Sequence, residues 1–130
     1  VVGFGLGTFA FSYAPFQISD DLSNASTNAG NRGNAHSEYL GLLAETGFMG
    51  LLCYLAIIIT TIAAALRVFK HSASAFSRQM ALFLLLSLST YYLHSFLNNF
   101  LDMDKIASLF WGFMAVIVVL DIDTKKKAEL

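Results

Sequence analysis

Residues 48–66, FMGLLCYLAIIITTIAAAL, decide the fold, because this stretch carries no charged side chain. Two further uncharged stretches follow it, residues 79–101 and residues 106–120. An α-helix needs about 20 apolar residues to cross the roughly 30 Å hydrocarbon core of a bilayer. The first two stretches reach that length, and the third needs its flanking residues or a locally thinner bilayer. The pattern therefore predicts three membrane-spanning helices.

The composition of the whole chain supports this interpretation. Hydrophobic residues make up 56% of the 130 residues and charged residues only 13%. One buried helix of a soluble protein could explain one apolar stretch, but three leave too little polar surface to cover them in water. The formal net charge of −1 favours no class of partner, and the bases are not interleaved with aromatic residues, so we expect no nucleic-acid partner. Cys53 is the single cysteine, which excludes a disulfide framework, and no Cys/His set has zinc spacing, so we expect no metal and no cofactor.

The charges that flank these stretches predict an orientation. Bases without acids occupy the link between the first two stretches, and Lys125–Lys127 follow the third, whereas the region before Phe48 and the link at 102–105 are mainly acidic. Basic loops stay in the cytoplasm, so the first helix runs inward, the second outward and the third inward again.

We therefore expect an all-α polytopic membrane fragment in three parts. Residues 1–47 would form the end of a preceding apolar element, an outer loop and a short helix. Residues 48–121 would form the three spans, and residues 122–130 a basic cytoplasmic tail. The opening Val1-Val2-Gly3 lacks an initiator Met and a basic n-region, which predicts a piece of a longer chain without a signal peptide.

The stretch Arg32-Gly33-Asn34-Ala35-His36-Ser37-Glu38-Tyr39 is the strongest candidate for chemistry. Asn34 is a good helix N-cap, and Glu38 would then lie in the first turn, facing the positive end of the helix dipole. Unpaired N–H groups at a helix start, together with the Arg32 guanidinium, form a seat for a phosphate or diphosphate. The His36 imidazole can act as a base near neutral pH. The alternative is that Arg32 is a solvated loop residue and His36 an ordinary interfacial one.

Polar residues on two other segments allow further contacts. Glu38 and Glu45 share a helical face and could assist as a second base or hold Arg32, or could form a solvated face. In the second span, a polar stripe places His94 and Asn98 near the outer end, where they could line a substrate chamber. The stripe consists of Ser87, Tyr91, His94 and Asn98. Interhelical hydrogen bonding is the alternative explanation of this stripe.

The chain resembles the bacterial O-antigen ligase and polymerase family. The family signature, His followed by Asn, Ser or Gln, then nine residues and Gly-x-x-Gly, is matched by His36-Ser37 and Gly47-Phe48-Met49-Gly50. The text from Ala35 to Gly47 is similar to family members. So is the opening Gly3-Phe4-Gly5-Leu6-Gly7-Thr8-Phe9, whose glycines would allow close packing or a turn.

The resemblance implies a glycosyltransferase of the GT-C type in the bacterial inner membrane. Such enzymes transfer a glycan from an undecaprenyl-diphosphate carrier to an acceptor at the periplasmic face, without nucleotide sugars. The acceptor would be another glycan, lipid A-core or a protein. By this resemblance His36 is the functional residue, with Arg32, Ser37, Glu38, His94 and Asn98 as candidate substrate contacts. Ligases, polymerases and protein O-oligosaccharyltransferases share these features. A polysaccharide transporter or flippase component is the alternative from another class.

Overall fold

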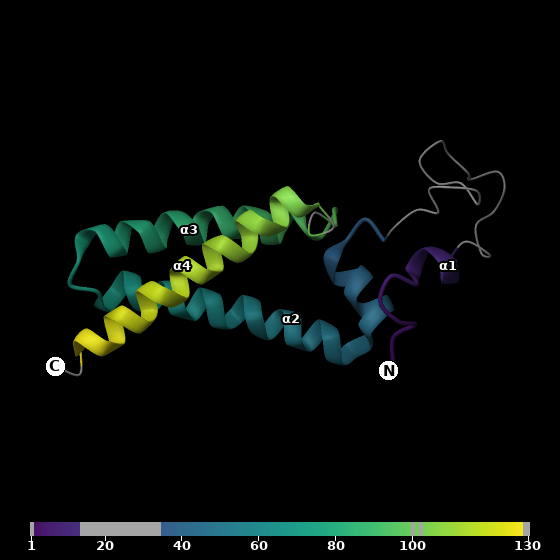
Figure 1. Ribbon diagram of the computed structural model, residues 1–130, viewed down its shortest axis with the longest axis horizontal. Helices are drawn as coiled ribbons and strands as arrows, with labels where there is room; N and C mark the ends of the chain where they lie inside the picture. Colours follow the sequence, from purple (N-terminus) through teal and green to yellow (C-terminus); the bar gives the residue numbers. More distant parts are fainter. Residues whose placement is uncertain (1, 14–34, 100, 102, 129–130) are drawn as a thin grey trace. The chain divides into compact units, whose positions relative to one another are not determined.

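The computed structural model describes residues 2–13, 35–99, 101 and 103–128. Over these residues the chain is helical and contains no strand, with elements in the order α1 (Phe9–Tyr13), α2 (Glu38–His71), α3 (Ala75–His94) and α4 (Asp104–Ala128) (Figure 1). This confirms the predicted all-α class. The chain divides into two compact units, the first comprising Val1–Cys53 and Ser95–Asn99 and the second comprising Tyr54–His94 and Phe100–Leu130.

Helix α2 contains the stretch that decided the fold, and it bends near its N-terminal end (Figure 1). The bend lies at Gly47, whose φ of 72° and ψ of −167° are not helical. This bend lies where the sequence placed the boundary between the short helix, in residues 1–47, and the first span, which begins at residue 48. From Phe48 to His71 the helix is long enough, at about 1.5 Å per residue, to cross a bilayer.

Among the described residues, two helices are long and apolar enough to cross a membrane, α2 and α4. Only 28% of the apolar window of α2 and 22% of that of α4 are buried, whereas the core helix of a soluble protein is mostly buried. Helix α3 is not one of the two, although the sequence predicted a span there. Its apolar run is interrupted by Arg78 and Gln79 near the start and by hydroxyl and imidazole side chains toward the end.

The apolar core of the second unit is small. Its fully buried side chains include Val68 of α2, Leu88 of α3 and Ile117 of α4. Helices α3 and α4 also pack through aromatic rings: Phe110 lies 4.5 Å from Tyr91 and 6.1 Å from Tyr92, measured between ring centroids. Large apolar side chains elsewhere on these helices, such as Phe83 and Val119, are more than 60% exposed.

The helix ends differ from the predicted stretches. Arg67 and Lys70 belong to α2 and Arg78 to α3, so the basic link is reduced to a short turn at 72–74. Helix α4 continues past Leu120 to Ala128, and the lysines of the predicted tail lie in its last turn. Basic side chains at a helix C-terminus interact favourably with the helix dipole, which helps to explain the extension.

Candidate functional site

Ser37 caps the N-terminus of α2. Its hydroxyl oxygen accepts a hydrogen bond from the backbone N–H of Leu40 at 3.4 Å, and only 3% of the residue is exposed. Serine is among the preferred N-cap residues because its oxygen satisfies one of the N–H groups that a helix start leaves unpaired. The predicted cap, Asn34, was therefore wrong, since the helix begins at Glu38. Asn34 and Arg32 both lie outside the described residues.

A segment distant in sequence fixes this helix start. The backbone carbonyl of Ser95 accepts the N–H of Glu38 at 3.0 Å and the hydroxyl of Ser37 at 3.4 Å. Ser95 is fully buried. Next to it the ring of Phe96 stacks on that of Tyr39, with 4.3 Å between centroids and an interplanar angle of 26°. Residues 95–96 thus hold the start of α2 through hydrogen bonds to Ser37 and Glu38 and through the ring of Tyr39.

His36 precedes the cap in an unusual backbone conformation. Its φ is 44°, in the left-handed region that non-glycine residues seldom occupy and that histidine adopts more readily than most. The residue is exposed, whereas its neighbours Ser37 and Glu38 are buried, at 3% and 7% exposure. The structure therefore separates the predicted residues: Ser37 and Glu38 are built into the first unit, and His36 lies on its surface.

The two glycines of the signature have separate structural roles. The φ and ψ of Gly47 fall in a region that is essentially restricted to glycine. Gly50 follows one turn later, where an added Cβ would overlap the side chain of Thr46. The Thr46 hydroxyl is itself directed at the carbonyl of Leu42, 2.7 Å away. Gly47 is thus explained by the bend in α2, and Gly50 by the close approach of Thr46.

The N-terminal glycine segment covers the carbonyls next to the bend. The N–H groups of Phe4 and Gly5 donate to the carbonyls of Ala44 and Glu45, each at 2.9 Å. A Cβ on Gly3 would collide with the backbone of Glu45 and Gly47. The sequence predicted that these glycines allow close packing or a turn. Gly3 confirms the first, and the positive φ of Gly5, 112°, confirms the second.

Glu45 also contacts the start of α1. Its Oε1 accepts the backbone N–H of Phe9 at 3.4 Å, so the carboxylate makes a contact within the first unit. Arg32, which Glu45 was expected to hold in one interpretation, is not among the described residues.

The polar stripe of the second predicted span is not continuous. Helix α3 ends at His94, and Asn98 lies beyond the turn at 95–97. The prediction that Asn98 shares a helical face with His94 was therefore wrong, because the carbonyl of Ser95 bonds to the start of α2. Ser87 donates to the carbonyl of Phe83 within its own helix at 2.9 Å. Asn98 belongs to the first unit and His94 to the second.

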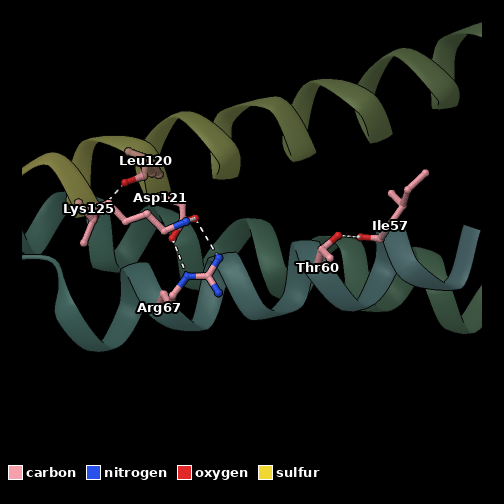
Figure 2. A network of polar contacts seen from close by, with 7 residues as sticks. Ile57, Thr60, Arg67, Leu120, Asp121 and Lys125 are labelled. Atoms are coloured by element: carbon pink, nitrogen blue, oxygen red, sulfur yellow. Dashed lines mark hydrogen bonds and ion pairs between the residues drawn. The ribbon is translucent and has the colours of Figure 1, made fainter. Parts of the chain in front are cut away.

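Sequence reasoning missed a charged cluster in the second unit. The Arg67 guanidinium and the Asp121 carboxylate form two hydrogen bonds, Nε to Oδ1 at 3.0 Å and Nη2 to Oδ2 at 2.9 Å (Figure 2). Lys125 Nζ lies 2.8 Å from the same Oδ2. One signal could have indicated the pair: Arg67 and Asp121 are the first charges after two of the uncharged stretches.

No group of three or more His, Cys, Asp or Glu residues within the described part of the chain could hold a metal ion. No protein-family model, curated protein or solved structure matches this chain.

Proposed function

We propose that this chain is part of a membrane glycosyltransferase of the O-antigen ligase type. It would transfer or polymerise glycans from an undecaprenyl-diphosphate carrier at the periplasmic face of the bacterial inner membrane. The observation that supports this proposal is the division of roles within the signature. Ser37 caps α2, Gly47 bends it and Gly50 accommodates Thr46, while the imidazole of His36 is left exposed at the helix start.

Membrane insertion is the first part of the proposal. Helices α2 and α4 have the length and apolarity to span a bilayer, and most of their apolar windows are not buried within the chain. For α3 we propose a third crossing, in contact with other helices or a wet cavity. Its hydroxyls support this, since Ser89 and Thr90 donate to carbonyls of their own helix at 2.8 and 3.2 Å. Such bonds reduce the cost of polar groups in hydrocarbon.

The proposed chemistry needs little beyond positioning and charge. The acceptor hydroxyl would lose its proton to the His36 imidazole as its oxygen bonds to the anomeric carbon of the donor sugar. The bond from that carbon to the diphosphate breaks, and undecaprenyl diphosphate leaves with the electron pair. Cations near the diphosphate stabilise the charge that develops there, and Arg32 is our candidate. Ser37 and Glu38 hold the helix start that carries His36, and His94 and Asn98 remain candidates for contacts with the acceptor.

The proposed role of the His36 imidazole as a base is tested by a substitution that keeps the positive φ of the backbone. Asparagine tolerates a positive φ well, so His36→Asn removes the base and retains the turn. Glycan transfer from a lipid-diphosphate donor is measured in membranes containing the protein, with His36→Ala in parallel. We expect a fall of roughly a hundredfold or more, the usual contribution of a general base. Ser108→Ala is the control, because Ser108 is exposed and donates to the carbonyl of Lys105 in its own helix.

The acceptor that the reaction requires distinguishes a ligase, a polymerase and a protein O-oligosaccharyltransferase. Transfer that requires added lipid A-core would indicate a ligase, elongation of the donor glycan alone a polymerase, and labelling of added protein a protein O-oligosaccharyltransferase. Wild-type transfer by His36→Asn would overturn the catalytic role of His36. Glycan movement across the membrane without any transfer would favour a transporter.

A further inference from the structure

A hollow of about 370 Å³ lies in the second unit, beside the turn between α2 and α3. The turn contributes residues 71–74, and α4 contributes Thr124 and Lys127 from its last turns. The guanidinium of Arg78 donates to the carbonyl of Ser72 at 3.4 Å. The residues that line the hollow thus include Lys127, His71 and two serines, and Arg78 is bonded to the turn that contributes them.

The segments that form this end of the unit have an excess of positive charge. Residues 67–78 and 121–128 contain six lysines and arginines against two aspartates. Asp121 pairs with Arg67 and Lys125, and Asp123 pairs with Lys127 at 2.7 Å. Arg78, Lys70 and Lys126 remain without an acidic partner in the described part of the chain. Because the acids are outnumbered, an anion is attracted to this end.

Exposed apolar side chains occur close in sequence to the residues that line the hollow. Phe69 is 43% exposed, Phe76 67% and Ile122 60%. A free phosphate ion would use the cations and hydroxyls and leave these side chains without a role. A ligand that carries both a phosphate and hydrocarbon chains would use both sets.

We propose that this hollow binds the phosphate headgroup of an anionic phospholipid, whose acyl chains lie along the exposed apolar side chains of α2, α3 and α4. Basic pockets at the ends of membrane helices bind such headgroups through charge and hydrogen bonds. The inference rests on the membrane insertion proposed above and is independent of glycosyl transfer. A binding assay therefore tests it whether or not the protein is a transferase.

The test is a titration of the detergent-purified protein, followed by native mass spectrometry. The probes are a short-chain phosphatidylglycerol, the zwitterionic phosphatidylcholine of equal chain length, and inorganic phosphate. We expect tight retention of phosphatidylglycerol alone. Lys127→Gln removes a lining cation, and Lys126→Gln removes the same charge from the neighbouring position, which does not line the hollow. Ala73→Trp fills the hollow without changing the charge.

Each comparison has a defined outcome. We expect the Kd for phosphatidylglycerol to rise about fivefold in Lys127→Gln, the loss expected for one lysine near an anionic headgroup. It should rise at least as much in Ala73→Trp and stay near the wild-type value in Lys126→Gln. Equal losses in the two lysine variants with no effect of Ala73→Trp would mean diffuse attraction to a basic flank and would overturn the site. Retention of phosphatidylcholine or inorganic phosphate as tight as that of phosphatidylglycerol would overturn the assignment to an anionic lipid.

Discussion

Arg67 and Asp121, which are 54 residues apart in the chain, form a two-point ion pair that joins α2 to α4. The two partners differ in environment, because the side chain of Asp121 is 8% exposed and that of Arg67 46%. A carboxylate that is removed from water needs its partners, whereas the guanidinium retains hydration. The pair therefore fixes which turn of α2 lies against which turn of α4, and Asp121 is its more sensitive member.

Asp121→Asn should destabilise the second unit more than the same substitution at Asp123, two residues further along α4. Asparagine keeps the shape but removes the charge that Arg67 and Lys125 share. We expect the melting temperature to fall by about 3–5 °C, measured from the fluorescence of Trp111, the single tryptophan. Asp123→Asn is the control, because its pair with Lys127 is exposed on both sides, at 49% and 64%, and such pairs contribute little. Equal losses in both variants would contradict the special role of Asp121.

Gly47→Ala should straighten or destabilise the bend of α2. The φ of 72° with ψ of −167° is strained for any residue with a Cβ, at a cost of about 1–3 kcal/mol. The unfolding free energy should fall by that amount, and transfer activity should fall with it if the bend positions His36. Gly41→Ala is the matched control in the same helix, because the nearest atom to its added Cβ is 3.9 Å away. Alanine there should be neutral or stabilising. A more damaging Gly41→Ala would show that the bend is not the constraint.

Residue patterns predicted those features that depend on local sequence. The uncharged stretches predicted the apolar parts of α2 and α4, and the bend at Gly47 lies at the boundary expected between the short helix and the first span. These features follow from burial and backbone sterics within a few residues, which periodicity and glycine placement report directly.

The features that were missed depend on contacts between distant residues. The stretch 79–101 stays uncharged past His94, whereas α3 ends there and the next residue, Ser95, accepts hydrogen bonds from Glu38 and Ser37. The cap could not be assigned to Ser37 over Asn34 by residue type, since both are good N-caps. Arg67 and Asp121 each appeared as a flanking charge, and only the folded chain shows that they form a pair.

Gly3→Ala should release the N-terminal segment from the bend. The added Cβ would collide with the backbone of Glu45 and Gly47, which cannot move aside as a flexible side chain would. The amides of Phe4 and Gly5 donate to the carbonyls of Ala44 and Glu45. We therefore expect faster hydrogen exchange at these two amides, measured by mass spectrometry of the N-terminal peptide. Gly112→Ala is the control, because its added Cβ has no neighbour within 4 Å among the described residues. Unchanged protection in Gly3→Ala would contradict the close approach.

Ser37→Ala separates the structural role of the cap from the proposed role of His36. The substitution removes the acceptor for the Leu40 N–H and the donor to the Ser95 carbonyl, and loss of an N-cap costs about 0.5–2 kcal/mol. Ser37→Asn keeps a capping oxygen and should recover most of that stability. Transfer should follow the same order, with Ser37→Asn above Ser37→Ala and both above His36→Asn. If Ser37→Asn were as inactive as His36→Asn while as stable as the wild type, the Ser37 hydroxyl would have to contact substrate, and its assignment as a cap alone would fail.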